Sequence, residues 1–460
     1  MKYRVLTGVA VLASWGCGGT NMEDVEAYSS ALNVANGTEF KNKLTADPYG
    51  TYTLTADIDM GGTALQVAAF YGTLDGAGHT IKNVKQLLAS SSGDAGLFGL
   101  LQGATVKNLK LTGVNFRALS AGGLSSNCWN AVIQSVSVSG AVEAGGNAGG
   151  LCGAVSGSTI TSSSATGTVK STGGYAGGLF GYSSIGRSGL GVSISNCSVA
   201  SMTVTGVTAA GGLMGYCQDP SITRASIDAT VSGQATAGGI CGEMNGGGIS
   251  NSYAKGTSVT SSSGPAGGIV GTAGIGLLTV PTDRIEIRSA YSQYTDVTAS
   301  TQAGGIVGTG KDPLMYDVYT KGNVTGTGAV GGLIGRAQSD THGWTLNNGI
   351  FRGAVTDRSR NWAGVVGTVD TSLSYRWTLT LFNRDLDSTD PYLVDGDRQK
   401  PVTGAQLVAP SATPSGVYCY NVLPSTVCGD SAFPNEQWDP GTSGQHHALR
   451  NMPGPNAQPR

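Results

Sequence analysis

A glycine-rich hexapeptide recurs along this chain and limits the fold more than any other feature. It reads AGGIVG at residues 266–271, and related hexapeptides occur in ten places. These units end at residues 99, 126, 153, 181, 215, 242, 271, 308, 335 and 367, so most intervals are 27 to 29 residues and the longest is 37. Self-similarity at this period indicates a solenoid in which each unit forms one coil.

An apolar pattern inside each unit predicts strands. Apolar residues recur in steps of two, which is the period of a strand with one buried face. An odd first step falls at serine or asparagine, such as Asn196 and Asn251, and predicts a bend. The first inward residues are expected to be Val106, Ile133, Ile160, Ile194, Ile222, Ile249, Ile287, Met315 and Leu346. The chain should therefore be all-β, a β-helix or β-solenoid of about ten coils with three short strands each.

The paired glycines have a physical explanation in such a fold. Without a Cβ, glycine lets two backbones approach closely or adopts φ values that other residues avoid. The residue after the inward leucine is also apolar, for example Phe180 and Met214. Adjacent residues on a flat strand point to opposite faces, so either the chain bends here or both faces are covered. A helix is the poorer alternative, because glycine costs about 1 kcal/mol relative to alanine at each helical position.

The N-terminal residues 1–17 have the features of an export signal. Lys2 and Arg4 precede an apolar stretch that is too short to span a bilayer. The Gly16-Cys17 pair resembles a bacterial lipoprotein cleavage site, which predicts a lipid on Cys17 and attachment to the outer membrane or cell surface. Ordinary cleavage nearby, giving a secreted protein, is the alternative.

The rest of the chain divides by its pattern. Residues 18–35 are predicted to form a tether. The N-terminal cap and first coils should follow, with a short helix at 38–46 that has Thr38 as N-cap and turns Phe40 and Leu44 inward. In order along the chain, the predicted parts after the tether are 36–94 for the cap and first coils, 95–375 for the repeat solenoid, and 376–460 for an irregular C-terminal cap and tail.

The repeats resemble a known family. The AGGLxG hexapeptides, together with ISNSYAKG at 249–256, ISNCSVAS at 194–201 and the lead-in YTLTADIDMGG at 52–62, are similar to the GLUG-motif repeats of bacterial secreted and surface proteins. The resemblance covers about residues 36–453. It implies a β-solenoid exposed at a bacterial surface. It says little about activity, because such repeats occur beside many functions, including adhesins and a zinc peptidase.

The cysteines allow several pairings. Cys128 and Cys217 occupy equivalent positions, as do Cys152 and Cys241, so the interval from Cys128 to Cys152 equals that from Cys217 to Cys241, at 24 residues. This duplication suggests two disulfides between neighbouring coils. Against it, the partners are offset by three residues, and Cα atoms more than about 7 Å apart cannot be bridged, so buried thiols that fill the core are the preferred interpretation and the two bonds are the alternative. Cys197 should be a packed thiol. In the irregular C-terminal segment, Cys419 and Cys428 are expected to form a disulfide in an oxidising compartment.

Composition and acid placement argue against catalysis. A net charge of -2 with 12% charged residues gives no basic patch for nucleic acid. A polysaccharide lyase or glycoside hydrolase needs clustered carboxylates, but no two acids fall at the same position of neighbouring coils. A zinc-peptidase HExxH motif is absent. No cofactor is expected, although five aspartates within 385–397 offer oxygen ligands to calcium as an alternative to a solvated loop. We expect a protein that is not an enzyme, with a carbohydrate-active enzyme as the alternative.

One surface pattern suggests a binding flank. Tyr253, Tyr291 and Tyr319 occupy equivalent positions that should face outward, beside a polar and basic row. The row consists of Lys255, Gln293, Lys321 and Arg352. Aromatic faces beside hydrogen-bond donors suit contact with a saccharide or a protein. The expected function is a cell-surface scaffold or adhesin that binds an extracellular polysaccharide or a surface protein. Stacking of like residues for stability alone is the other interpretation.

Overall fold

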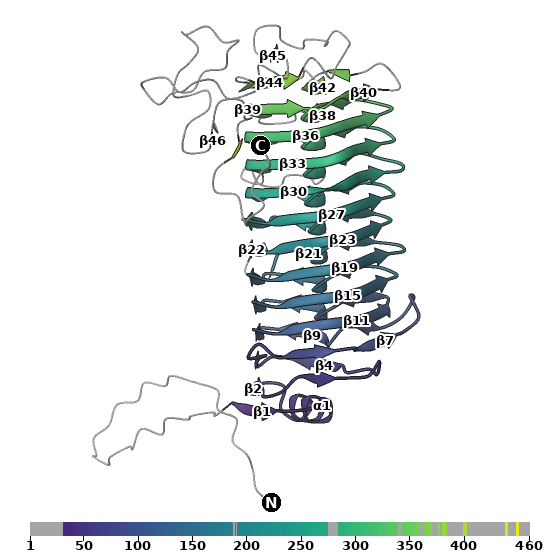
Figure 1. Ribbon diagram of the computed structural model, residues 1–460, viewed down its shortest axis with the longest axis vertical. Coiled ribbons are helices and arrows are strands. Elements are labelled where there is room, and N and C mark those ends of the chain that lie inside the picture. The colour runs from purple at the N-terminus through teal and green to yellow at the C-terminus, as the bar shows by residue number, and fades with distance from the viewer. Residues whose placement is uncertain are drawn as a thin grey trace, which may run out of the picture.

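The chain forms a parallel β-solenoid, as its computed structural model shows (Figure 1). The structure describes residues 31–186, 189, 191–274, 284–338 and 343–357, and beyond these 362–363, 365–369, 376–377, 380–383, 399–402, 438–439 and 448–449. Three parallel sheets run along the long axis, with 24, 11 and 10 strands. The predicted all-β solenoid of about ten coils is therefore confirmed.

From β8 to β42, each coil contributes to all three sheets. The eleven-stranded sheet contains β4 (Val67–Phe70), β9 (Phe98–Gln102), β13 (Ser125–Trp129), β17 (Cys152–Ser156), β21 (Phe180–Ser184), β25 (Met214–Gln218), β29 (Cys241–Asn245), β32 (Val270–Ala273), β35 (Val307–Lys311), β38 (Ile334–Gln338) and β42 (Val366–Val369). The ten-stranded sheet contains β8 (Asp94–Ala95), β12 (Ser120–Gly122), β16 (Ala148–Gly149), β20 (Tyr175–Gly177), β24 (Ala209–Gly211), β28 (Ala237–Gly238), β31 (Ala266–Gly267), β34 (Ala303–Gly304), β37 (Val330–Gly331) and β41 (Trp362–Ala363).

The 24-stranded sheet, called the large sheet below, carries the rest of each coil. Its early strands are β1 (Leu32–Val34), β2 (Thr51–Leu54), β3 (Ile58–Asp59), β5 (Thr73–Asp75), β6 (Thr80–Lys82), β7 (Lys85–Leu87), β10 (Thr105–Lys107), β11 (Lys110–Ala118), β14 (Val132–Gln134), β15 (Ser137–Ala144), β18 (Thr159–Thr161) and β19 (Ser164–Ser171). Its later strands are β22 (Ser193–Ser195), β23 (Ser198–Gly206), β26 (Ser221–Thr223), β27 (Ser226–Gly233), β30 (Gly248–Ser261), β33 (Glu286–Ala299), β36 (Leu314–Gly326), β39 (Thr345–Arg352), β40 (Val355–Asp357), β43 (Arg376–Trp377), β44 (Thr380–Asn383) and β45 (Gln399–Val402).

The predicted inward column forms the spine of the core. From Val106 to Leu346 its nine members pair with one another in consecutive coils, and all are buried. The bend after this position is also present, because Asn196 and Asn251 have φ values of 54° and 47°. Register is strongly specified here, since a slip of one residue would turn the whole apolar set to the solvent.

The hexapeptide both bends and is covered on its outer side. Leu179 and its neighbour Phe180 are both fully buried in the core. A Cβ added to Gly215 would lie 2.6 Å from the carbonyl oxygen of Gly181 and 2.9 Å from the backbone nitrogen of Ala176. The ten-stranded sheet of one coil therefore lies against the eleven-stranded sheet of the next coil. Glycine is required because no side chain fits between these backbones.

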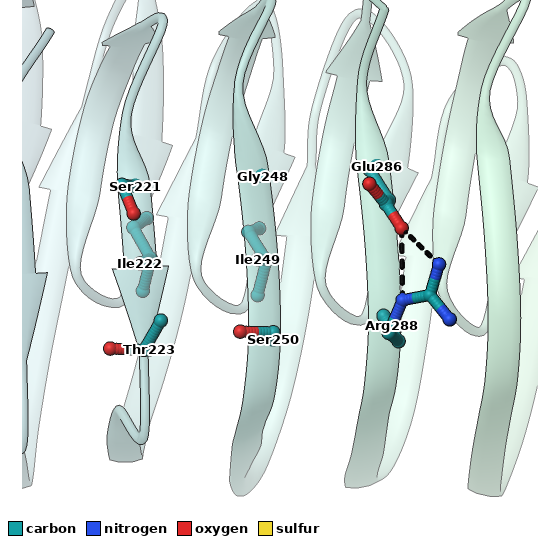
Figure 2. A pocket seen from close by; sticks show the side chains of 8 residues that line it. All are labelled: Ser221, Ile222, Thr223, Gly248, Ile249, Ser250, Glu286 and Arg288. Carbon is teal, nitrogen blue, oxygen red and sulfur yellow. Dashed lines mark hydrogen bonds and ion pairs between the residues drawn. The ribbon is translucent and has the colours of Figure 1, made fainter.

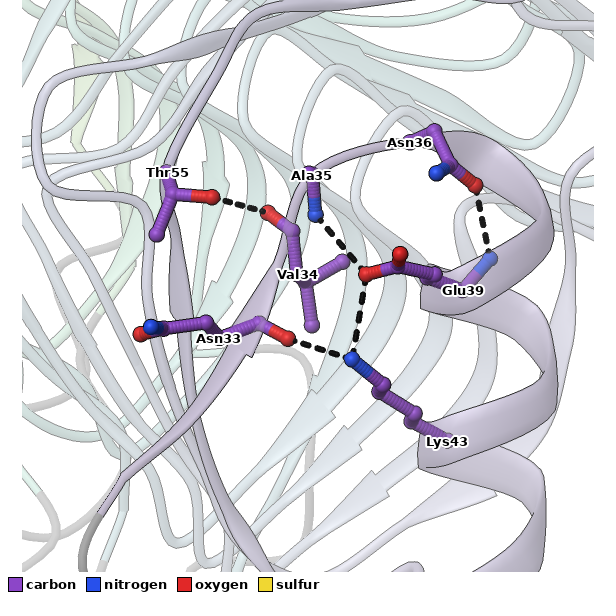
Figure 3. A network of polar contacts seen from close by, with 7 residues as sticks. All are labelled: Asn33, Val34, Ala35, Asn36, Glu39, Lys43 and Thr55. Atoms are coloured by element: carbon purple, nitrogen blue, oxygen red, sulfur yellow. Dashed lines mark hydrogen bonds and ion pairs between the residues drawn. The ribbon is translucent and has the colours of Figure 1, made fainter.

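A helix lies at the N-terminal end of the solenoid (Figure 1), and a network of polar contacts holds its first turn (Figure 3). The helix is α1 (Gly37–Ala46), with Phe40 and Leu44 buried as predicted. The N-cap is Asn36 and not Thr38, because the Asn36 Oδ1 accepts from the Glu39 backbone nitrogen at 3.0 Å. Glu39 Oε2 accepts from the backbone nitrogen of Ala35 and from Lys43 Nζ. This network fixes the entry of the chain, which is a capping function.

The two ends of the chain differ from the predicted boundaries. Leu32–Val34 belongs to β1, which pairs with β2, so the last part of the predicted tether 18–35 is already a strand of the large sheet. At the other end, the large sheet continues through β43, β44 and β45, beyond residue 375. A separate two-stranded ribbon, β46 (Trp438–Asp439) and β47 (Ala448–Leu449), lies with β47 against β33. The predictions for residues 1–17, Cys17, Cys419, Cys428 and the aspartates of 385–397 lie outside the described residues.

Two disulfides join neighbouring coils, so the preferred interpretation of these four cysteines as buried thiols is wrong. Cys128 is bonded to Cys152 and Cys217 to Cys241, with Cα atoms 6.2 and 6.3 Å apart. The three-residue offset is present, since Cys152 pairs in register with Ser125. It does not prevent bonding, because all four cysteines point into the core from strands that bend at the hexapeptide. Cys197 is a free, buried cysteine, as predicted.

Candidate functional site

The predicted tyrosine column is present, but it is buried. Tyr253, Tyr291 and Tyr319 lie in register on β30, β33 and β36. The rings of Tyr253 and Tyr291 stack, with centroids 4.9 Å and planes 8° apart. Their exposed fractions are 2%, 0% and 3% for Tyr253, Tyr291 and Tyr319. The prediction that these rings form an open contact surface is therefore wrong.

The tyrosines are buried on the outer side of the large sheet. Ala254, the residue after Tyr253, belongs to the hydrophobic core inside the solenoid, and none of the three column tyrosines does. Because adjacent residues of a strand point to opposite faces, Tyr253 points to the outer side. An outer side chain becomes buried only when another segment covers it, and β47 lies against β33, the strand that carries Tyr291. Burial raises the pKa of the Tyr291 hydroxyl, and the neighbouring tyrosines add to the effect. The column therefore acts as a packing surface.

The basic row beside the tyrosines lines an open hollow. Lys255, Gln293, Lys321 and Arg352 lie in register on successive coils, as predicted. The first three of these side chains border a hollow of about 480 Å³. The side chain of Arg352 is not among those described. Lys255 Nζ lies 3.7 Å from Asp228 Oδ2, so one wall also carries an acid. Ammonium, amide and carboxylate groups thus meet around one hollow on the outer face.

A second hollow lies on β26, β30 and β33, before the bend at Asn251 (Figure 2). Its volume is about 280 Å³. Ser221, Gly248 and Glu286 lie in register along it, and Gly248 contributes no side chain. Glu286 Oε1 accepts from Arg288 Nε at 2.9 Å and from Arg288 Nη2 at 2.5 Å. The guanidinium carbon of Arg288 lies 4.5 Å from the ring centroid of Tyr316 in the next coil.

A tyrosine cluster on the other sheets was not predicted. Tyr175 precedes one hexapeptide, Tyr182 follows it, and Tyr216 follows the next. Because the hexapeptide reverses the chain, the rings of Tyr175 and Tyr182 meet with centroids 5.6 Å apart. Tyr182 and Tyr216 stack with centroids 5.0 Å and planes 10° apart. The sequence does show that tyrosines flank the hexapeptide directly. This pattern predicts contact between the rings only if the chain reverses at the hexapeptide.

Glu243 adjoins this cluster. It lies in register with Tyr216, on the following coil. Burial raises the pKa of Glu243 to about 7. Burial, with the Glu243 charge as a smaller cause, raises the pKa of Tyr175 to about 12. In the sequence Glu243 was one scattered acid among several, and its neighbours distinguish it.

Asp228 and Glu243 each lie beside side chains that are not acidic in the neighbouring coils. Asp228 lies in register with Lys255, and Glu243 lies between Tyr216 and Thr272. Within the described part of the chain, no group of three or more histidine, cysteine, aspartate or glutamate residues could hold a metal ion. In the same part, no helix has the length and apolar character needed to cross a membrane.

Comparisons with known proteins assign the chain to no family. No protein-family model matches the chain, and no curated protein matches it either. Four solved chains match, and one is a protein of Bacteroides ovatus described as a candidate immunoglobulin A1 protease. It is 21% identical, the alignment covers 66% of this chain and 78% of that chain, and the TM-score is 0.33. The class of this protein, a parallel β-solenoid, is therefore defined by its own coils.

Proposed function

We propose that this protein is a non-catalytic scaffold or adhesin of a bacterial cell surface, which binds an extracellular polysaccharide along the outer flank of the large sheet. The observation that carries the proposal is the hollow bordered by Lys255, Gln293 and Lys321. Coils repeat at about 4.8 Å, so the row presents hydrogen-bond donors at regular intervals. Such a row suits a polymer whose hydroxyl or carboxylate groups also repeat. The alternative ligand at the same hollow is a protein, and a binding experiment with glycans distinguishes the two.

The first experiment removes the basic row. The double variant Lys255→Ala and Lys321→Ala should bind an immobilised acidic polysaccharide such as alginate about tenfold more weakly than wild type, a loss of about 1.4 kcal/mol. The change is attributed to two lost ammonium donors in one hollow. Binding is measured by surface plasmon resonance at fixed salt, because contacts between exposed charges are screened.

A matched control uses lysines on distant coils. Lys85 and Lys110 are exposed on early strands of the large sheet, so Lys85→Ala with Lys110→Ala removes the same charge elsewhere and should bind as wild type does. If both double variants lost the same affinity for alginate, the loss would result from the change in net charge and not from the hollow. Binding of neither alginate nor neutral dextran by wild type, with capture of a surface protein, would favour the protein partner. Release of shortened sugars would contradict the non-catalytic assignment.

Export and lipid attachment at Cys17 complete the proposal. Two inter-coil disulfides support it, because disulfides persist in oxidising compartments. The resemblance to GLUG-motif repeats supports a surface location in the same way. Cells fed labelled palmitate should label the wild type in the membrane fraction. Cys17→Ala should lose the label and leave that fraction, and retained label would argue against Cys17 as the acceptor.

A further inference from the structure

The Tyr182–Tyr216 stack ends at an unusual neighbour. One ring face of Tyr216 lies against Tyr182 of the preceding coil. On the other side of Tyr216, the residue in register on the next coil is Glu243 of β29, and the one after it is Thr272 of β32. The stack therefore ends at a layer that has a carboxyl group in place of a third ring. Tyr175, from the ten-stranded sheet, packs against the side of the stack with its centroid 5.4 Å from that of Tyr216.

Glu243 has no cationic partner among the described residues. No ion pair joins it, and burial accounts for its raised pKa with no contribution from a neighbouring charge. The titratable groups around it are the hydroxyls of Tyr175 and Tyr216, whose pKa values are raised chiefly by burial. Thr272 on the following strand and the alanines and glycines of β24 and β28 bring no charge. A half-buried acid without a cation is costly, so the site favours a ligand that supplies one.

Elsewhere in the molecule one arginine contacts both an acid and a tyrosine ring, although there the tyrosine is in register with the arginine and not with the acid. On β33, Glu286 pairs with Arg288, and the Arg288 guanidinium lies over the ring of Tyr316. The acid and the arginine are two residues apart on one strand. On β29, the residue two positions after Glu243 is Asn245, so acid and tyrosine are both present but the guanidinium is not.

We propose that Glu243 and Tyr216 form a binding site for an arginine side chain of a partner protein. The guanidinium packs at the end of the tyrosine stack, beside Tyr216, and pairs with the Glu243 carboxylate there. Its planar shape suits stacking and paired hydrogen bonds, whereas a lysine ammonium does not continue a stack of rings. Charge complementarity identifies the occupant, because the described surroundings of Glu243 lack a cation. The site lies on the eleven-stranded sheet and is independent of the polysaccharide flank on the large sheet.

The direct test uses a single arginine as probe. N-acetyl-L-argininamide is titrated into the full-length protein, and binding is followed by saturation-transfer NMR. The neutral citrulline analogue has nearly the same shape as the arginine probe but no charge. N-acetyl-L-lysinamide has the positive charge but lacks the planar guanidinium group. We expect saturable binding of the arginine probe and at least tenfold weaker binding of the other two. Equal binding of the citrulline analogue, or no binding of the arginine probe, overturns the proposal.

Variants and pH separate this site from other contacts. Glu243→Gln keeps the shape and should weaken binding at least tenfold, and Tyr216→Leu should do the same, while Tyr216→Phe retains the ring and the binding. Glu143→Gln on the large sheet is the matched control. An acid with a pKa of about 7 is ionised above that pH, so affinity should fall about thirtyfold from pH 8.5 to pH 5.5. A Glu243→Gln protein that folds, judged by its circular dichroism, and binds as wild type does would refute the site.

Discussion

Gly211→Ala should prevent the chain from forming a stable stacked solenoid. A Cβ at this position would overlap the carbonyl oxygen of Met214 and lie 2.7 Å from the backbone nitrogen of Gly242 in the next coil. Both obstacles are backbone atoms, which cannot rotate away as a side chain can, so two coils would have to separate. The expected loss is about 4 kcal/mol or more, the range of severe core mutations. Soluble yield and thermal unfolding followed by circular dichroism measure it.

The matched control is Gly248→Ala. An added Cβ there meets only the carbonyl oxygen of Glu286, at 3.7 Å, and Gly248 is not among the glycines with positive φ. Alanine should therefore be tolerated, with a change in stability within about 1 kcal/mol. If Gly211→Ala unfolded at the wild-type temperature, close contact of the hexapeptide backbones would not be the reason for its glycines.

The coil spine could be predicted because its signal is repeated and local. The column from Val106 to Leu346 places an apolar residue at the same point of every coil, and a strand that slipped by one residue would expose it. The helix at the N-terminal end was also predictable from Phe40 and Leu44. Its cap was predicted wrongly as Thr38, since Asn36 and Thr38 are both good N-cap residues.

The features that were missed depend on geometry between coils. The disulfide between Cys217 and Cys241 looked too long on flat strands, and the bend at the hexapeptide shortens it. The same bend brings Tyr175 to Tyr182, which lie on either side of one hexapeptide. The burial of Tyr291 has another cause. The ring lies on the outer side of the large sheet, where β47, from a distant part of the sequence, lies against the strand that carries it, and no periodic pattern reports such a contact.

The basic row was predictable in part, in its register but not in the hollow that it borders. Lys255 and Lys321 could be placed in register from the repeat alone, because each follows its tyrosine at the same distance. The hollow that they border could not be predicted, because it also depends on Gly256 and Gly322 and on the depth of Tyr294. Register follows from periodicity, whereas the shape of a surface depends on each side chain that lines it.

Removal of both disulfides should be the second large effect. Each bond joins residues 24 apart, and a loop of that length restricts the unfolded chain by about 3 kcal/mol. The four-cysteine variant, with Cys128, Cys152, Cys217 and Cys241 replaced by alanine, should therefore unfold at a temperature lower by on the order of 10 °C. Differential scanning calorimetry measures the shift, and non-reducing peptide mapping of the wild type should recover both bonded pairs.

Comparison with Cys197→Ala distinguishes the bonds from simple core packing. Cys197 is buried but free, so its loss removes one sulfur atom from the core without changing the unfolded chain, and it should cost much less than either pair. The two pairs should also act nearly additively, because they join different coils. A reductant present during unfolding should lower the unfolding temperature of the wild type and leave that of the four-cysteine variant unchanged. If the wild type did not respond, and its buried cysteines reacted as free thiols after denaturation, the coils would be held by packing alone.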